Sequence, residues 1–350
     1  MFAQLFFYGI CIDRGSIIKI FNGYMKKIVV IGSSNTDMTV RSERFPETGQ
    51  TLLGGDFMMS QGGKGANQAV AIARLGGRAT FVAKVGDDMF GREARQSYAA
   101  EGIDTDYVSV DGSAPSGVAL INVNGRGENR IVVASGANYS ISREDIERAA
   151  GVIASADIVL MQLESPLACI EYAARIACDA GARVILNPAP AAALPDTIYK
   201  SLYAIVPNQS EASALSGVEI VDRASAVEAA RAIAARGVGR VVITLGADGA
   251  LVYEHGSAIF VAALNVDAVD TTAAGDTFCG ALCVALSEGR SLSEAVRFAT
   301  CCSAISVKRK GAQPSIPYRA EVDAMIASEQ AGRKSQPGLP ACGALATAEL

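Results

Sequence analysis

The sequence is poor in the residues from which many catalytic and metal centres are built. Its one histidine, His255, lies in a Tyr-Glu-His-Gly stretch that predicts a hairpin turn, so we expect no histidine-based mechanism. Its eight cysteines form no CxxC pair and have no histidine partner at metal-ligand spacing. The pairs Cys279/Cys283 and Cys301/Cys302 are predicted to pack inside helices. This cysteine usage is typical of a reduced compartment, and we expect a cytoplasmic protein.

No apolar run at the start of the chain reaches the length of a membrane-spanning helix. Residues 5–8 are apolar, but charged residues interrupt the segment soon afterwards. The segment also has no basic stretch and no small-residue cleavage site, which argues against a secretory signal. We therefore expect residues 1–24 to be a dispensable N-terminal extension and expect no membrane contact. The net charge of −5 argues against a nucleic-acid partner.

The composition is that of a globular protein with a large core. Of 350 residues, 50% are hydrophobic and 19% are charged. Strand-like runs alternate with helix-like runs between residues 66 and 245. The strand-like runs are 79–84, 157–161, 183–186, 203–206 and 240–244, and the helix-like runs are 88–101, 142–154, 166–180, 208–216 and 224–236. Because the strands are almost continuously apolar, we predict an α/β fold with a doubly wound, mostly parallel sheet flanked by helices.

A second set of strand-like segments interrupts this rhythm. Segments 39–41, 51–59, 117–123 and 130–134 alternate between apolar and polar residues. We predict that about 35–60 and 115–135 form a small β-sheet lid over the site, within one domain spanning 25–330. The apolar residues of this lid suggest pairing with a second copy, as a homodimer. Residues 331–350 are rich in Gly, Pro and Ala, and we expect them to be disordered.

The stretch 269–278 carries the clearest chemical signal. It follows β-like runs at 258–261 and 266–269 and leads into an apolar, helix-like run at 278–286. The first N–H groups of a helix lack intrahelical partners, and Ala273, Ala274 and Gly275 would let an anion approach them. Asp276 places a proton acceptor at the same point, which suits phosphoryl transfer onto a hydroxyl. A simple helix cap and turn would also explain these residues.

Other polar residues follow the predicted strands, at the edge where ligands bind in open α/β sheets. Asn35 and Asp37 are two residues apart, so on an extended segment both side chains face the same way and can grip vicinal hydroxyls. Gln162 and Glu164, Asn187, and Asn208 with Glu211 follow three further strands. The last pair also fits a capping box, and cap and site can coexist.

The glycine-rich segment 61–69 opens a predicted helix but matches neither common phosphate-binding motif. Lys64 is followed by glycine rather than Ser or Thr, which excludes a Walker A loop. Gln68 stands where a dinucleotide fingerprint requires its third glycine, which disfavours a NAD-dependent dehydrogenase. Glycines at the mouth of a helix still allow close approach of a polar ligand.

Taken in order, these motifs resemble those of the ribokinase-type carbohydrate kinases. They are Gly-Gly-Lys-Gly-Ala-Asn at 62–67, Asn-Pro-Ala-Pro at 187–190, Asn-x-x-Glu at 208–211 and Asp-Thr-Thr-Ala-Ala-Gly-Asp-Thr-Phe at 270–278. The resemblance covers about residues 26–329. It implies ATP-dependent phosphorylation of the 5-hydroxyl of D-ribose, with Asp276 as the general base and the N–H groups of 273–276 as an anion hole.

The resemblance also implies a set of binding residues. Those implied for the sugar are Asn35, Asp37, Gly62, Gly63, Lys64, Gly65, Asn67, Glu164 and Asp276. Those implied for ATP are Asn208, Thr244, Leu245, Gly246, Ala247, Asp248, Gly249, Gly275, Asp276 and Thr300. Mg²⁺ would lie near Glu211, bound largely through phosphates and water. K⁺ would be bound, mainly through backbone carbonyls, by Asp270, Thr272, Ser306, Arg309, Gly311 and Ser315.

Two alternatives share many of these features. A sister kinase for deoxyribose, fructose, adenosine or pseudouridine would carry the same phosphate-handling motifs. Asn35, Asp37 and Glu164 suit a polyhydroxylated sugar and favour ribose. A catalytically inactive sugar-sensing module is the other alternative, and the intact Asp276 with its anion loop argues against it.

Overall fold

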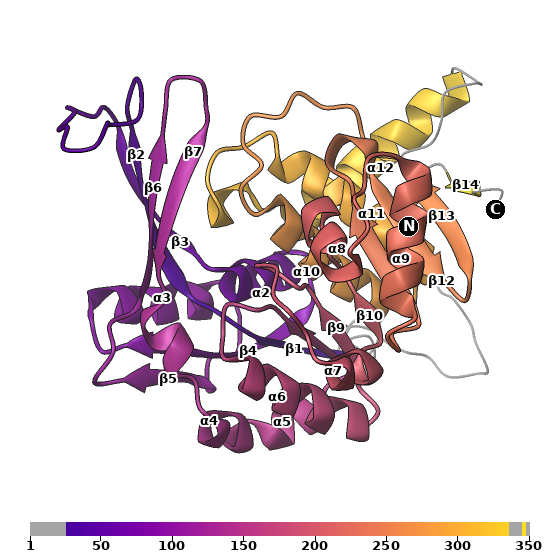
Figure 1. Cartoon of the computed structure of the whole chain (residues 1–350), viewed down its shortest axis with the longest axis horizontal. Helices are drawn as coiled ribbons and strands as arrows, with labels where there is room; N and C mark the ends of the chain where they lie inside the picture. Colours follow the sequence, from indigo (N-terminus) through magenta and orange to yellow (C-terminus); the bar gives the residue numbers. More distant parts are fainter. Residues whose placement is uncertain (1–25, 336–344, 348–350) are drawn as a thin grey trace, which may run out of the picture.

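The structure is a computed structural model that describes residues 26–335 and 345–347. The predicted extension 1–24 lies outside the described residues. A central sheet crosses the molecule (Figure 1). Its strands, in spatial order, are β14 (Leu345–Thr347), β13 (Ser257–Val261), β12 (Ala250–Glu254), β11 (Arg240–Thr244), β10 (Ala204–Ile205), β9 (Arg183–Leu186), β8 (Ile158–Met161), β1 (Lys27–Ile31), β4 (Arg78–Gly86) and β5 (Val108–Asp111). Strands β11 to β5 are parallel, and β12, β13 and β14 add an antiparallel edge.

Helices cover both faces of this sheet because its strands are apolar on both sides. In β1, Ile28 and Val30 belong to one buried cluster, and Val29 and Ile31 belong to the other. The first cluster packs under α2 (Lys64–Arg74), α3 (Met89–Ala100), α10 (Ala274–Ser287), α11 (Leu292–Ser306) and α12 (Arg319–Ser335). The second packs under α4 (Arg143–Arg148), α5 (Ala150–Ala154), α6 (Leu167–Asp179), α7 (Asp196–Ser201), α8 (Gln209–Ser216) and α9 (Arg223–Ala234). The predicted doubly wound α/β fold is confirmed.

The predicted lid is a separate sheet that stands away from the central one (Figure 1). Its strands, in order, are β3 (Phe57–Gly62), β2 (Asn35–Arg41), β6 (Gly117–Val123) and β7 (Asn129–Ala134). Met38 pairs with Met59 on one side and with Leu120 on the other, so these three side chains share a face. Asn35 and Asp37 point to the opposite face. The lid therefore presents polar side chains on one face and apolar ones on the other.

Three expectations about local structure were wrong. Residues 266–269 are not a strand, because the N–H of Val269 and that of Asp270 donate to the carbonyl of Val307 at the end of α11 instead of to a sheet neighbour. Residues 51–56 are irregular, and the lid strand begins at Phe57. In the terminal segment expected to be disordered, 331–335 continue α12 and 345–347 form β14; the rest of that segment lies outside the described residues.

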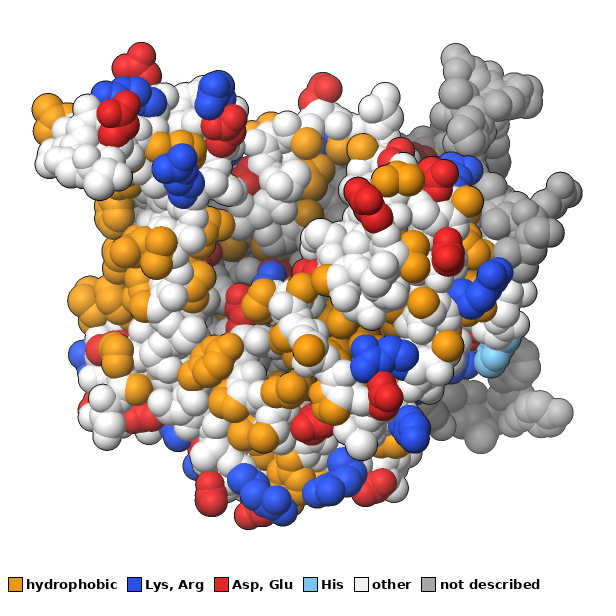
Figure 2. All heavy atoms as spheres, in the orientation of Figure 1, with side chains coloured by type: hydrophobic (Ala, Val, Ile, Leu, Met, Phe, Trp, Pro, Cys, Tyr) orange, Lys and Arg blue, Asp and Glu red, His pale blue; other side chains and the backbone are white. Residues whose placement is uncertain are grey.

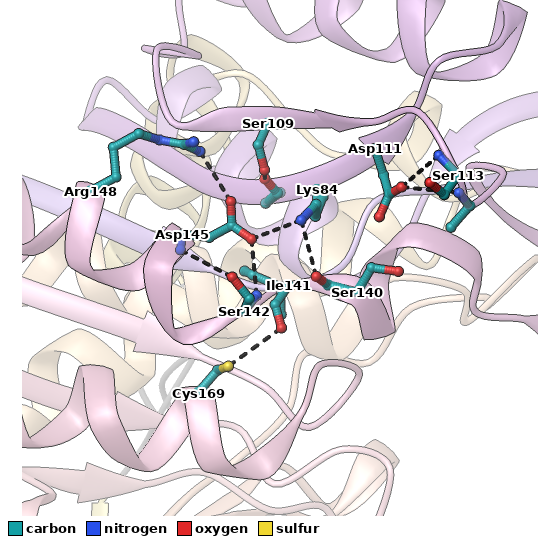
Figure 3. Close-up of polar contacts among 12 residues, drawn as sticks. Lys84, Ser109, Asp111, Ser113, Ser140, Ile141, Ser142, Asp145, Arg148 and Cys169 are labelled. Carbon is teal, nitrogen blue, oxygen red and sulfur yellow. Dashed lines mark hydrogen bonds and ion pairs between the residues drawn. The ribbon is translucent and has the colours of Figure 1, made fainter.

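A polar cluster fastens the segment after the lid to the core (Figure 3). Lys84, on β4, donates to the carbonyl of Ser140 at 3.1 Å and to Asp145 Oδ2 at 3.0 Å. Arg148 donates to Asp145 Oδ1 at 3.3 Å. Ser140 ends η1 (Gly136–Ser140), the short turn that follows β7. The cluster therefore fixes the base of the lid to β4, the strand beside the edge strand β5.

Candidate active site

The first turn of α10 forms the centre of the site. Ala273, at its N-cap, has a φ of 58°, which is uncommon outside glycine. The N–H of Ala274 donates to the carbonyl of Thr271 at 3.2 Å, and that of Thr277 makes a helical bond to Ala273. The N–H groups of Gly275 and Asp276 lie between them, in the turn that lacks intrahelical acceptors. A Cβ on Gly275 would meet nothing within 4 Å, so this turn opens into space.

Asp276 is held by a network of buried amides. Asn67 Nδ2 donates to Asp276 Oδ2 at 2.9 Å, and Gln68 Nε2 donates to Asp276 Oδ1 at 3.0 Å. Gln68 Nε2 also donates to Asn187 Oδ1 at 3.1 Å, and Gln68 Oε1 accepts from Gln162 at 2.5 Å. The sequence did not assign Gln68, Gln162 or Asn187 a role. For two of them the sequence does hold a sign, because Gln162 and Asn187 directly follow neighbouring strands, β8 and β9.

The predicted sugar-side residues come together under the polar face of the lid. Glu164 accepts hydrogen bonds from the Ser33 hydroxyl and from the backbone N–H of Lys64. Two glycines are needed for close packing here. A Cβ on Gly62 would lie 2.2 Å from Asp37 Oδ2, and one on Gly63, at φ 87°, would lie 2.7 Å from a backbone nitrogen. The glycines of the 62–67 motif therefore admit the polar side chains around them.

Asn35 is held by a residue for which no sequence motif predicts a role. Asn138, in η1, donates to Asn35 Oδ1 at 2.8 Å and to the carbonyl of Ser34 at 3.1 Å. Its Oδ1 accepts from the N–H of Ser34 at 2.8 Å. Asn138 follows the lid strand β7, far from Asn35 in sequence, so no local pattern predicts the contact.

The site gathers negative charge around one lysine. Burial, together with the nearby carboxylates of Glu164 and Asp276, raises the pKa of Asp37 to about 7. Burial opposes a charged Lys64, but the carboxylates of Asp276, Glu164 and Glu211 outweigh it, and the pKa of Lys64 is raised. The fully charged lysine can thus offset part of the negative charge that a phosphoryl donor brings.

A large pocket lies beside the first turn of α10, where Ala274 and Gly275 line it. Its volume is about 1160 Å³. It is lined by the predicted nucleotide residues Asn208, Thr244, Leu245, Gly246, Ala247, Gly249, Gly275 and Thr300. Asp248 and Asp276, which were also predicted for ATP, are not among the lining residues. Figure 2 shows a hollow with charged side chains at its floor, between the lid and the part of the molecule that carries α8. The lining of the pocket itself includes no charged side chain.

The sequence missed several residues of this pocket, although helical periodicity would have found them. Ser303, Ala304 and Val307 line it together with Thr300, at spacings of three, four and seven residues along α11 and its end. Gln209 and Ser213 do the same along α8. Ile220 and Phe278 add apolar surface. The pocket thus has a mixed polar and apolar wall, to which α8, α11, the start of α10 and the loops around 244–249 and 263–271 contribute.

The Asn208–Glu211 pair forms the predicted capping box. Asn208 Oδ1 accepts from the N–H of Glu211, and Glu211 Oε2 accepts from the N–H of Asn208, both at 2.8 Å. Burial raises the pKa of Glu211. Glu211 therefore caps α8 and also belongs to the group of carboxylates around Lys64, so the two interpretations made from the sequence are compatible.

The segment predicted to bind a monovalent cation is tied together by Asp270. Its Oδ1 accepts from the N–H of Thr272, and its Oδ2 from the N–H of Gly311, both at 2.9 Å. Burial acts to raise the pKa of Asp270, but these hydrogen bonds outweigh burial and lower it. Ser306 and Ser315 are fully buried. The Arg309 side chain pairs with Glu321, so only the backbone of Arg309 remains for a ligand.

The donor set fits hard cations that are held loosely by the protein. Within the described residues, no three His, Cys, Asp or Glu side chains are grouped to hold a metal ion. Mg²⁺ in kinases is held by one or two carboxylates and by substrate phosphates, so the single Glu211 is compatible with it. Backbone carbonyls around 270–272 and 306–315 offer the oxygen ligands that a monovalent cation would need.

Comparison with known proteins decides the class of this site. The model of the pfkB family of carbohydrate kinases matches residues 25–319. The chain belongs to this family. Among its relatives, this kinase is 45% identical to the ribokinase of Haemophilus influenzae over 296 residues, which cover 85% of this chain and 97% of that protein. It is 36% identical to the deoxyribokinase of Salmonella typhi over 291 residues, covering 83% of this chain and 95% of that protein.

A solved structure agrees with the fold. The ribokinase of Arabidopsis thaliana, complexed with ribose and ATP, superposes with a TM-score of 0.80 and 32% identity, covering 86% of this chain and 98% of that one. The kinase described here is therefore a carbohydrate kinase. Across its described residues, none of the helices combines the length and apolar character needed to cross a bilayer.

Proposed function

We propose that this kinase transfers the terminal phosphoryl group of ATP to the 5-hydroxyl of D-ribose, giving D-ribose 5-phosphate and ADP. The observation that carries the proposal is the position of Asp276. It is buried between the polar lid face with Asn35 and Asp37 and the pocket lined by Gly275. The similarity to ribokinases, one of them solved with ribose and ATP, supports the choice of both substrates.

In the proposed reaction, Asp276 accepts the proton of the sugar hydroxyl as that oxygen attacks phosphorus. The new O–P bond forms as the bond between phosphorus and the ADP oxygen breaks. The N–H groups of Gly275 and Asp276 donate to the transferring phosphoryl oxygens, together with the positive end of α10. Ala273 and Ala274 shape the turn. Since the transition state for phosphoryl transfer is loose, position and charge compensation matter more than covalent help.

The lid would exclude water, which otherwise competes with the sugar for the phosphoryl group. Mg²⁺ would be held near Glu211 and would neutralise phosphate charge. K⁺ would be held by the carbonyls of the 270–272 and 306–315 segments. Because Asp270 joins these two segments, cation binding would order the approach to the first turn of α10.

Deoxyribose is the strongest alternative substrate, because deoxyribokinases are also similar to this chain. A site that hydrogen-bonds a hydroxyl discriminates strongly against the analogue without it, by as much as ~10⁴-fold. We expect kcat/KM for ribose to exceed that for 2-deoxyribose by at least ~10²-fold in a coupled ADP-release assay with MgATP. Faster turnover of 2-deoxyribose would keep the mechanism and overturn the sugar. Absence of turnover with every sugar would favour the sensing module.

We also propose that the lid pairs with a second copy of the chain. The face opposite Asn35 and Asp37 carries exposed apolar side chains: Val40, Phe57, Met59, Leu120 and Val132. Figure 2 shows hydrophobic side chains gathered over the lid. A contiguous apolar patch of this kind marks an interaction surface, and a self-complementary sheet face suits a homodimer.

A further inference from the structure

The proposed base is buried among other titratable side chains. Asp276 is only 7% exposed. The titratable groups that interact with it come from three other segments and from its own helix: Asp37, Lys64, Glu211 and Cys279. Glu164 joins the same cluster through Asp37 and Lys64. A general base must be ionised and correctly oriented before it accepts a proton. Direct hydrogen bonds to its oxygens are therefore functionally important.

A backbone carbonyl, reached from Gln68 through Asn187, determines which group donates and which accepts in each of these hydrogen bonds. The carbonyl of Val206 can only accept, and Asn187 Nδ2 donates to it at 2.9 Å. Asn187 must then turn its Oδ1 towards Gln68, and Gln68 must present its NH₂ group, which also reaches Asp276. Gln162 completes the order by donating to Gln68 Oε1. Reversing the Gln68 amide would place two oxygens against each other at Asn187 and at Asp276.

Gln68 has no polar group left for a substrate. Its NH₂ donates to Asp276 and Asn187, its oxygen accepts from Gln162, and the side chain is fully buried. Asn67 differs, because its Oδ1 is buried without a partner in the described structure and can accept from a sugar hydroxyl. Of the three side chains that Gln68 contacts, only Asp276 has a proposed part in the reaction, so we expect Gln68 to act on the reaction through Asp276.

From this order of donors and acceptors we infer that Gln68 is a positioning residue, aligned by Asn187 and Gln162, which holds Asp276 ionised and oriented towards the sugar hydroxyl. The inference rests on the proposed role of Asp276 as base. The donor that Gln68 supplies is charge-assisted, and the loss of one such bond corresponds to a shift of about one pH unit or more in the ionisation it supports.

The test is the pH dependence of kcat for Gln68→Met, which keeps the length of the side chain and removes both donors. We expect the acid limb of the kcat profile to move up by about one pH unit or more, and kcat below the limb to fall about tenfold. Above the limb, kcat should return towards the wild-type value, and KM for the sugar should change by less than about threefold. Gln96→Met, on the exposed side of α3, is the matched control and should leave the profile unchanged.

A second variant keeps the test decisive if Gln68→Met does not fold. Gln162→Met removes the donor to Gln68 Oε1 and should move the acid limb in the same direction by a smaller amount. A folded variant of either kind with an unchanged limb, or with kcat lowered equally at every pH, would overturn the inference. The Asp276→Asn variant tests the proposed base separately. If that variant stays active, Asp276 is not the base, and the proposed function fails independently of the result for Gln68.

Discussion

Replacing Asp37 with Asn should make the sugar-free kinase more stable at alkaline pH. Burial, together with Glu164 and Asp276, raises the pKa of Asp37 from 3.8 to about 7 in the folded chain. A group whose folded pKa is raised contributes stability that is fully present below its unfolded pKa and is lost as pH rises through the folded pKa. Over about three pH units at ~1.4 kcal/mol each, ionisation of Asp37 costs about 4 kcal/mol by pH 8.5.

The assay is urea unfolding of wild type and Asp37→Asn without sugar, at several values between pH 4 and pH 8.5. Asn carries no charge, so the variant should match wild type near pH 4 and exceed it by up to about 4 kcal/mol at pH 8.5. The same variant should bind ribose far more weakly, because it loses a carboxylate acceptor. A stability difference that does not change with pH would refute the reasoning.

Further changes probe the lid and its anchor. Lys84→Met leaves Asp145 buried without its main cationic partner and should cost about 3 kcal/mol in urea unfolding; a cost below about 0.5 kcal/mol would contradict this. Leu120→Asp should shift the oligomer towards monomer in sedimentation analysis, whereas an unchanged mass would argue against lid pairing. Gly62→Ala pushes a methyl group against Asp37 and should raise KM for ribose at least tenfold, measured by initial rates; an unchanged KM would place the sugar elsewhere.

The sequence predicted features that depend on short stretches of chain. Apolar runs marked the strands of the central sheet, and the turn at His255 was recognised from its local residues. The run 266–269 is equally strand-like, but the N–H of Val269 donates to the carbonyl of Val307, a partner that lies about forty residues away. A strand-like pattern indicates which side chains of a segment can be buried. It does not indicate which other segment supplies the hydrogen-bond partners.

The same distinction applies to the site. Lys64, Asp276 and Glu211 lie in motifs, and the structure brings them into one electrostatic cluster. Gln68 and Asn138 act through residues more than a hundred positions away, so their roles became visible only in three dimensions. The residues that hold functional groups in place are therefore harder to predict than the groups themselves.

The most direct test of the account is the kinetics of Asp276→Asn with ribose and MgATP, alongside ribose binding measured by calorimetry. Asn keeps the shape of the side chain and cannot accept the hydroxyl proton as a carboxylate does. We predict that kcat falls by ~10² to 10⁴-fold or more, while ribose affinity changes little. Turnover close to that of the wild type would contradict the assignment of Asp276 as the base, and with it the proposed mechanism.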